Sequence, residues 1–348
     1  MSPFTSILAA TDFSVDGNNA VRRAALLAHE HGAHLHVLHV LKVAGCKPLR
    51  EWFSPTTDID LKSAQARAAL RRVAVEISGA YDVTATVEVE VGDPLATLMQ
   101  ASERADLVVL GQRGHSRVET LPIGKTADCM LRTSRRPVLV VKKAAEAPYR
   151  RVLMPVDFTA CSASAVQFAA RLVHGARMHV FHATDSHLES ILRRSDVAES
   201  IIRDVRAREE TAATARMRRR VAGLGLESTR MSFSVGHGPA DLATLQRARA
   251  LGTDLIVAGK QGRSTLGGFL LGSVSSRVLS GSDCDMLIVP RRREGSLPRA
   301  ASTQTVLVDA EAQPDTAGPA RSDAAHAGAV SPAHRTQSTT RFLPGRTS

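Results

Sequence analysis

The sequence has 348 residues, of which 43% are apolar and 23% charged, so it can form packed cores and is not disordered throughout. No run approaches the roughly 18 apolar residues that a membrane-spanning helix needs, and the N-terminus lacks the regions of a secretory signal, so we expect a soluble cytoplasmic protein without a membrane partner. The formal charge is +11, but basic residues are spread along the chain and aromatic residues make up only 3%, which does not favour a nucleic-acid partner.

Short apolar runs alternate with longer amphipathic segments along most of the chain. Short, continuously apolar runs are typical of strands that are covered on both faces of a parallel sheet. The alternation therefore predicts βαβ units and an α/β fold with doubly wound parallel sheets. In chain order the predicted strands are 7–10, 35–41, 83–91, 107–110, 138–141, 152–156, 178–183, 231–235, 255–258 and 286–289, and the predicted helices include 20–31, 61–78 and 203–221.

The chain repeats itself. The segment 6–14 returns as 151–159, and Ala-Asp-Leu-Val-Val-Leu-Gly at 105–111 returns as Thr-Asp-Leu-Ile-Val-Ala-Gly at 253–259. Because the order of the repeated segments is kept, the sequence predicts two copies of one domain. We place the first copy at 1–145, the second copy at 148–292, and a disordered tail, poor in apolar residues, at 293–348.

A glycine-rich segment follows the predicted strand 255–258 of the second copy. It contains Gly259 and Gly262 and ends at Gly272, where a further helix is predicted over 273–279. Glycine lets main-chain N–H groups approach an anion closely. A helix that begins at Gly272 would add unpaired amides and a partial positive charge, which favours phosphate binding.

Side chains near these glycines could add to an anion site. Ser273 and Ser275 carry hydroxyl donors, and Arg263 could make a charge-assisted hydrogen bond. The alternative is a glycine-rich surface loop with a serine N-cap, and the glycine count alone slightly favours that alternative.

The spacing G-x2-G-x9-G-S, together with a strand-end aspartate, a Val-Gly-x-Pro turn and the Asp-Leu-Val/Ile-Val strand in order, resembles the ATP-binding branch of the universal stress protein family. The resemblance covers both copies and leaves only the tail outside. It implies five parallel strands per domain, a Rossmann-like fold related to the adenine nucleotide α-hydrolases, and ATP as the ligand, with the participation of Mg²⁺ left open. The implied nucleotide-binding residues are Val156, Asp157, Gly259, Gly262, Arg263, Gly272, Ser273, Val274 and Ser275.

Two of these implied roles can be stated more closely. The resemblance implies that Asp157 lies near the adenosine and that the glycines and Ser273 hold the phosphates. Asp157 could equally shape the turn into the next helix, as Asp12 would at the same place in the first copy, and the two roles are compatible.

The first copy departs from the family pattern. It keeps Gly111, Gly114 and Gly124, but Lys125 stands where the second copy has Ser273. A P-loop ending at Lys125 is excluded because Glu119 stands where that motif needs glycine. We therefore expect one competent nucleotide site, in the second copy, and a first copy that serves chiefly as a structural partner.

The remaining polar motifs indicate no catalytic or metal site. The four cysteines are far apart, which does not favour disulfides or structural zinc. His36 and His39, and their counterparts His179 and His182, are expected to be buried and hydrogen-bonded, with His182 approaching the nucleotide pocket; a zinc site is the minority alternative.

The function that the resemblance implies is that of an ATP-binding regulator of the stress response, acting through conformational change or an unidentified protein partner. Slow ATP hydrolysis is the most catalysis we expect. The alternatives are an enzyme of the same fold, an ATPase or adenylate-forming enzyme, and a scaffold without nucleotide. The resemblance also implies dimerisation through the last strand of the domain. Because apolar edge strands need covering, we expect the strands 138–141 and 286–289 to pair within the chain as a pseudo-dimer, with homo-oligomerisation left open.

Overall fold

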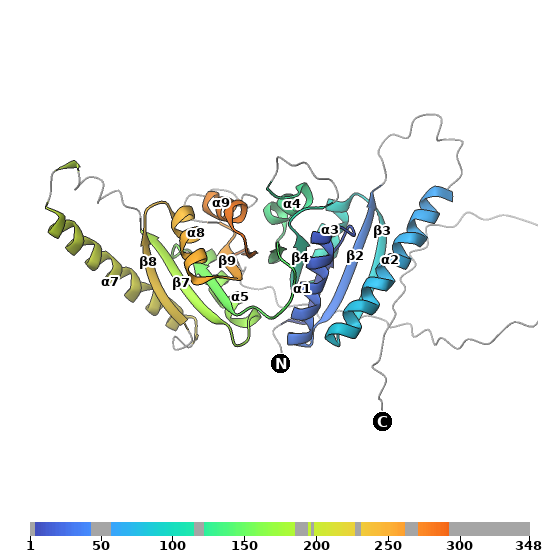
Figure 1. Ribbon diagram of the computed structural model, residues 1–348, viewed down its shortest axis with the longest axis horizontal. Coiled ribbons are helices and arrows are strands. Elements are labelled where there is room, and N and C mark those ends of the chain that lie inside the picture. The colour runs from blue at the N-terminus through green and yellow to red at the C-terminus, as the bar shows by residue number, and fades with distance from the viewer. Residues whose placement is uncertain are drawn as a thin grey trace, which may run out of the picture. The chain divides into compact units, whose positions relative to one another are not determined.

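The structure is a computed structural model that describes residues 4–42, 57–114, 122–184, 194–195, 198–226, 231–261 and 271–291 (Figure 1). All of these residues belong to one compact unit. The predicted tail at 293–348 lies outside the described residues. Within the described ranges, no helix combines the length and the apolar character needed to cross a membrane.

Every predicted strand is present, with ends that differ from the prediction by at most two residues. The strands could be located in the sequence because strands buried on both faces need apolar side chains at successive positions, which gives short, continuous apolar runs. The strands are β1 Ser6–Ala10, β2 His34–Lys42, β3 Ala85–Gly92, β4 Leu107–Gly111, β5 Val138–Val141, β6 Arg151–Pro155, β7 Arg177–Thr184, β8 Met231–His237, β9 Leu255–Gly259 and β10 Asp285–Val289.

The strands form one ten-stranded sheet in the order β3-β2-β1-β4-β5-β10-β9-β6-β7-β8. Pairing within each copy is parallel, as predicted. The last strands of the copies, β5 and β10, pair antiparallel, with Met286 opposite Val140 and Ile288 opposite Val138. The two predicted five-stranded sheets are therefore joined within the chain into one.

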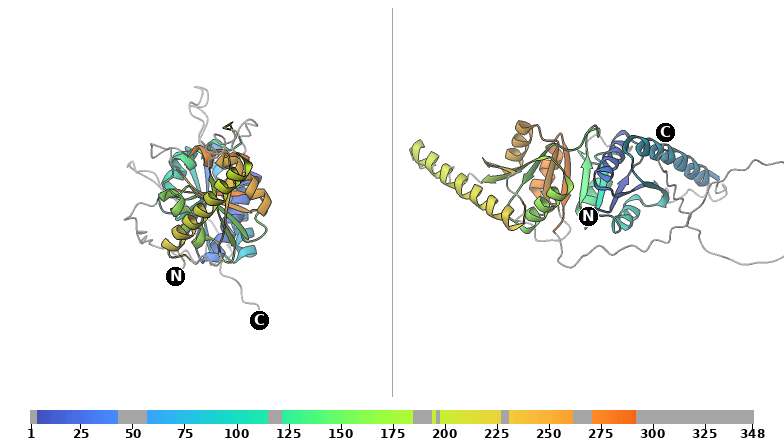
Figure 2. Two further views of the ribbon diagram at one scale, coloured as in Figure 1. Left: turned by 90° about the vertical axis from the view of Figure 1, so that its left-hand side faces the viewer. Right: turned by 90° about the horizontal axis from the view of Figure 1, so that it is seen from below.

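Helices cover both faces of this sheet (Figure 2). One core contains apolar side chains of α1, α2, α5 and α7, and the other contains those of α3, α4, α8 and α9. This is the doubly wound arrangement expected from the sequence. The helices are α1 Val15–His31, α2 Thr57–Tyr81, α3 Pro94–Ser102, α4 Lys125–Thr133, α5 Ala160–Leu172, α7 Glu199–Gly223, α8 Ala240–Leu251 and α9 Ser273–Gly281.

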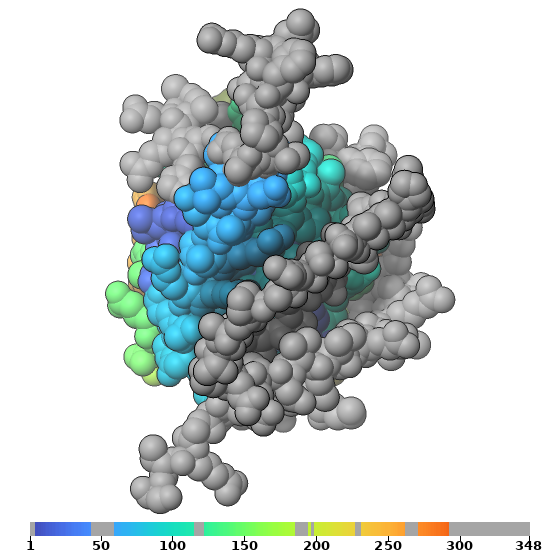
Figure 3. All heavy atoms as spheres, turned by 90° about the vertical axis from the view of Figure 1, so that its right-hand side faces the viewer, coloured from blue at the N-terminus to red at the C-terminus, as the bar shows by residue number. Residues whose placement is uncertain are grey.

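The sheet ends at β3 in the first copy and at β8 in the second. In Figure 3 the helix α2, in light blue, lies at the surface on the side of the first copy. Its Leu70 and Ile77 are buried in the same core as Leu35 and Val37 of β2. The outer strands β3 and β8 thus lie at opposite ends of the sheet, and the strands that join the two copies, β5 and β10, lie at its centre.

Aromatic and histidine side chains pack where α1 meets α5 across the junction. The Nε2 of His31 lies 2.8 Å from the main-chain oxygen of Leu172, so this nitrogen carries a proton and donates it. Ring centroids are 4.8 Å apart between His31 and His174 and 5.0 Å apart between Phe4 and Phe168. Burial lowers the pKa of His31, which favours the neutral ring that this apolar contact requires.

A buried ionic cluster also joins the copies. Asp285, the first residue of β10, is 1% exposed. Its carboxylate accepts hydrogen bonds from the Tyr149 hydroxyl at 2.6 Å and the Lys142 main-chain N–H at 2.8 Å, and it lies 3.5 Å from Nε of Arg23. The Arg23 guanidinium in turn donates to the Ala147 oxygen at 2.7 Å and lies 4.1 Å above the Tyr149 ring. The cluster thus ties α1 and the segment between the copies to the second copy.

Replacing Asp285 with Asn should lower the free energy of unfolding by about 3–5 kcal/mol, because the change leaves the buried Arg23 without its counter-charge. The control is Asp283→Asn, two residues away, where the carboxylate side chain is 80% exposed and a change below about 0.5 kcal/mol is expected. Urea denaturation followed by circular dichroism measures both. Equal, small effects would show that the cluster does not hold the copies together.

Candidate functional site

The candidate site lies where the strand order of the second copy reverses. β6 lies between β9 and β7, so the connections that leave β6 and β9 run in opposite directions. Ligands in doubly wound sheets bind at the carboxyl ends of the strands at such a point. Val156 and Asp157 follow β6 and Gly259 ends β9, so the structure brings these three predicted residues to the same edge of the sheet.

Asp157 shapes the turn into α5. Its Oδ1 accepts hydrogen bonds from the main-chain N–H of Thr159 at 3.0 Å and from the Thr159 hydroxyl at 2.6 Å. The Thr159 oxygen then caps α5 by accepting from the N–H of Ser162 at 3.3 Å. The structural role proposed for Asp157 is therefore observed, and its contact with adenosine stays a prediction.

The residue after each strand-end aspartate has a strained main chain. Phe158 and its counterpart Phe13 both have φ of 66°, in the left-handed region that bulky residues rarely adopt. Both copies therefore build the same tight turn, and the strain is tolerated because the turn is held from several sides.

Histidines hold these turns from the second strand. Nδ1 of His182 donates to the Val156 oxygen at 2.7 Å, and its ring centroid lies 4.5 Å from that of Phe158. In the first copy, buried His39 makes the same bond to Thr11 at 2.8 Å. His182 thus contacts the main chain of Val156, a predicted site residue, and its approach to a nucleotide pocket stays a prediction.

The other repeated histidines lie elsewhere. His36 lies 3.0 Å from the Glu88 carboxylate, and the two ring nitrogens of His179 lie 2.6 and 2.7 Å from the hydroxyls of Ser232 and Ser234. All the repeated histidines are thus hydrogen-bonded or ion-paired, although only His39 is fully buried. Among the described residues, His, Cys, Asp and Glu side chains form no group of three or more that could hold a metal ion.

The loop between β9 and α9 is closed by two hydrogen bonds. The N–H of Gly272 donates to the Lys260 oxygen at 2.9 Å, and the Ser275 hydroxyl donates to the Gly259 oxygen at 3.0 Å. Of the predicted phosphate-binding residues, Gly262 and Arg263 lie outside the described residues. The two hydrogen bonds fix the start of α9 beside the end of β9.

The N-terminus of α9 has the properties of an anion site. Gly272 occupies the N-cap position, and within the described ranges no side chain caps the helix. The first main-chain N–H groups of a helix have no partner inside it and carry a partial positive charge. Ser273 is exposed there, and Val274 and Ser275 are half-buried. The structure therefore places four of the predicted nucleotide-binding residues, 272–275, together at the start of α9.

Close packing, and not only phosphate binding, requires glycine at several of these positions. A Cβ on Gly259 would lie 2.9 Å from the carbonyl carbon and from the Cβ of Cys161 in α5. A Cβ on Gly111 would lie 2.5 Å from the carbonyl carbon of Asp16 in α1, and one on Gly114 would collide with the Asp12 carboxylate. In both copies, therefore, glycine at the end of the fourth strand is required for the close approach of a helix, whether or not phosphate binds.

The first copy keeps the backbone of the site. The N–H of Gly124 donates to the Gln112 oxygen at 2.8 Å, which reproduces the closure seen in the second copy. Gly124 is the N-cap of α4, again without a capping side chain among the described residues, and Lys125 is exposed at the first helical position. At the described ends of the two loops, the copies therefore share their backbone hydrogen bond and differ in the first helical residue, Lys125 against Ser273.

Lys260 belongs to this region and was missed from the sequence. Its side chain is 5% exposed, and its Nζ donates to the Ser134 oxygen at the end of α4, in the first copy, at 2.8 Å. Burial lowers the pKa of this ammonium to about 8. The signal that could have found it is the difference between the copies, because the first copy has Gln112 at this position.

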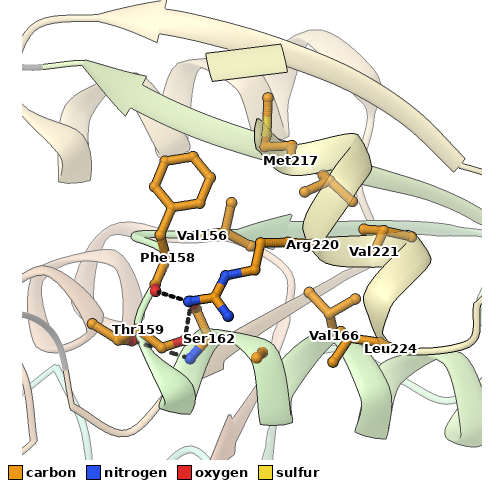
Figure 4. A pocket seen from close by; sticks show the side chains of 11 residues that line it. Val156, Phe158, Thr159, Ser162, Val166, Met217, Arg220, Val221 and Leu224 are labelled. Carbon is orange, nitrogen blue, oxygen red and sulfur yellow. Dashed lines mark hydrogen bonds between the residues drawn. The ribbon is translucent and has the colours of Figure 1, made fainter. Parts of the chain in front are cut away.

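A small, mostly apolar pocket lies behind the Asp157 turn, between α5 and α7 (Figure 4). Arg220 at its edge donates to the Phe158 oxygen at 3.0 Å, and the Arg216 guanidinium lies 4.0 Å above the Phe158 ring. Neither Gly259 nor Gly272 lines this pocket, so it is distinct from the predicted phosphate site. Its lining residues are Val156, Phe158, Thr159, Ser162, Ala163, Val166, Val180, Met217, Arg220, Val221 and Leu224.

Comparisons of the sequence with a family model and with known proteins all point to one protein family. Residues 3–142 and 148–290 each match the sequence model of the universal stress protein family. The chain is 27% identical over 302 residues to a universal stress protein of Mycolicibacterium smegmatis, which covers 82% of this chain and 97% of that protein. It is 35% identical over 114 residues to universal stress protein A homolog 2 of Coxiella burnetii, which covers 33% of this chain and 74% of that protein.

A solved structure of a universal stress protein from Archaeoglobus fulgidus has the same fold. It superposes with a TM-score of 0.61 at 22% identity and covers 82% of this chain and 96% of that chain.

Replacing Gly259 with Ala should lower the free energy of unfolding by about 1–3 kcal/mol, because the added methyl group meets the main chain of Cys161. The control is Gly79→Ala in α2, where nothing lies within 4 Å of the new Cβ and a gain of up to about 1 kcal/mol is expected. Chemical denaturation measures both variants. Full stability of Gly259→Ala would show that packing does not require this glycine.

Proposed function

The chain belongs to the universal stress protein family, and from this premise we propose that its second copy binds ATP and acts as a nucleotide-dependent regulator of the stress response. The observation that carries the proposal is the start of α9. Main-chain amides at Ser273, Val274 and Ser275 lie at a helix N-terminus that is attached to β9 by two hydrogen bonds. A seat of this kind suits a triphosphate, because the amides and the helix dipole both favour negative charge.

The nucleoside end of the ligand is supported by the turn after β6. Asp157 and Val156 lie at the carboxyl end of the strand next to β9, where the strand order reverses. The carboxylate is half-buried and held by Thr159, so it is a preorganised acceptor for the hydroxyl or amino groups of adenosine. Phosphates at α9 and adenosine at Asp157 together fit one nucleotide across the switch point.

A regulatory role is supported by where this site lies. Lys260 accepts the Gly272 N–H through its main-chain oxygen, and through its side chain it contacts Ser134 of the first copy. A nucleotide bound at Gly272 therefore acts beside the junction of the copies. If ATP binds more tightly to one arrangement of the two copies than to another, its binding shifts the population toward that arrangement and so changes the surface that a protein partner meets.

The test is isothermal titration of the full chain with ATP, with and without Mg²⁺, at physiological pH. We expect one ATP per chain. Ser273→Asp should abolish binding, because the new carboxylate occupies the amides and repels phosphate, whereas the same carboxylate stabilises the helix by about 0.3–1 kcal/mol. Loss of binding will therefore not reflect loss of folding.

The matched control is Lys125→Asp, at the same position of α4 in the first copy, where Lys125 is also exposed. This variant should keep the stoichiometry and affinity of the unaltered chain. Two equivalent sites, or a loss in Lys125→Asp as large as in Ser273→Asp, would contradict the assignment of ATP to the second copy alone.

A further inference from the structure

The helix that would seat the phosphates is held at its other end by the first copy. α9 is nine residues long and begins after Gly272. At its C-terminus the ammonium of Lys142, the residue after β5, donates to the main-chain oxygens of Leu279 at 2.5 Å and Ser282 at 2.7 Å. A third hydrogen bond, of 2.9 Å, goes to the Ser282 hydroxyl. One side chain of the first copy thus takes up carbonyl groups that the helix leaves unpaired.

Charge and placement both suit this contact. The last carbonyl groups of a helix have no partner inside it and carry a partial negative charge, which an ammonium complements. Lys142 is half-buried, and its main-chain N–H is fixed by the Asp285 carboxylate at 2.8 Å. It is therefore anchored through main chain and side chain, unlike a lysine on the surface.

A similar contact runs in the opposite direction. Lys260 of the second copy donates to Ser134 at the end of α4 in the first copy. The two lysines do not occupy corresponding positions, because Gln112 corresponds to Lys260 and Pro290 corresponds to Lys142. The duplication of one domain therefore does not by itself account for this pair of contacts, since each lysine stands where the other copy has a different residue.

We propose that Lys142 of the first copy is a positioning residue for the nucleotide site of the second copy, where it holds α9 so that the N-terminal amides of the helix meet the phosphates. This inference rests on the proposed ATP site. The first copy is not expected to bind nucleotide itself, because it has Lys125 where the second copy has Ser273. Through Lys142 it would nevertheless contribute to ATP binding by the second copy. A signal that moves the first copy would change ATP affinity in the second through this contact.

The charge of Lys142 provides a readout that packing alone does not. Burial lowers the pKa of Lys142 to about 8, while the charges of Asp283 and Asp285 oppose the shift and that of Arg113 adds to it. The Cys284 thiol stays neutral in this range, because burial raises its pKa to about 11. Lys142 is thus charged below pH 8 and loses its charge above, so ATP affinity should fall as the pH rises from 7 to 9.

The experiment compares Lys142→Met with Lys143→Met in the full chain. The second variant removes the neighbouring lysine, whose side chain is exposed. By titration calorimetry at pH 7, Lys142→Met should bind ATP about threefold to tenfold more weakly than the unaltered chain, and Lys143→Met should match the unaltered chain. Between pH 7 and 9, the ATP affinity of Lys142→Met should fall less than that of the unaltered chain. The remaining fall is expected from Lys260, whose pKa is also about 8.

Hydrogen exchange of the nucleotide-free protein tests the contact without ATP. In Lys142→Met, the amides of 276–281 should exchange faster, while those of β6 and β7 keep their rates. If this variant does not fold, Lys142→Gln, which keeps a donor without the charge, replaces it with the same expected results.

The outcomes separate this inference from the proposed function. ATP binding by the unaltered chain, with the same affinity and pH profile in Lys142→Met, would overturn the role of Lys142 and leave the ATP site standing. If the unaltered chain binds no ATP, the proposed function and the positioning role both fail, and faster exchange of 276–281 would then report a purely structural contact.

Discussion

The antiparallel pairing of β5 with β10 is the contact on which the rest of the structure depends. Each strand is the last of its copy, and all of its residues are buried and apolar or, in Asp285, engaged in the ionic cluster. Such an edge exposed to water would invite aggregation, and here each copy covers the edge of the other. Because the pairing fixes the copies in register, side chains of one can reach main-chain groups of the other.

Three kinds of contact use this register. The Asp285 cluster ties α1 to β10, the His31 and Phe4 rings pack α1 against α5, and Lys142 and Lys260 reach helix ends across the junction. Each involves polar groups whose burial is costly without partners, so the copies cannot separate without exposing several unpaired groups. A first copy with an altered binding motif is thereby retained as half of one assembly.

Much of the fold could be predicted because it depends on local patterns. Short apolar runs determine the strands, and the repeated Asp-Phe turn predicts the same geometry at Asp12 and Asp157, which the equal φ values of Phe13 and Phe158 confirm. The hydrogen-bonded histidines were also anticipated, since polar rings on an apolar strand need partners. The steric need for Gly259 was not, because it arises from α5, nearly a hundred residues earlier in the chain.

The sequence by itself determined the duplicated α/β architecture, the pairing of its last strands and the glycines that mark a candidate nucleotide site. The architecture and the glycines depend on periodicity, repetition and motif spacing, which can be seen along the chain. The pairing of the last strands was expected from the family resemblance and from the need to cover apolar edge strands. Only the tertiary structure decided that Lys142, Lys260 and Asp285 act across the junction. The physical reason is that a buried charge is specified by partners brought together in space, and neither their identity nor their distance is encoded in any local pattern.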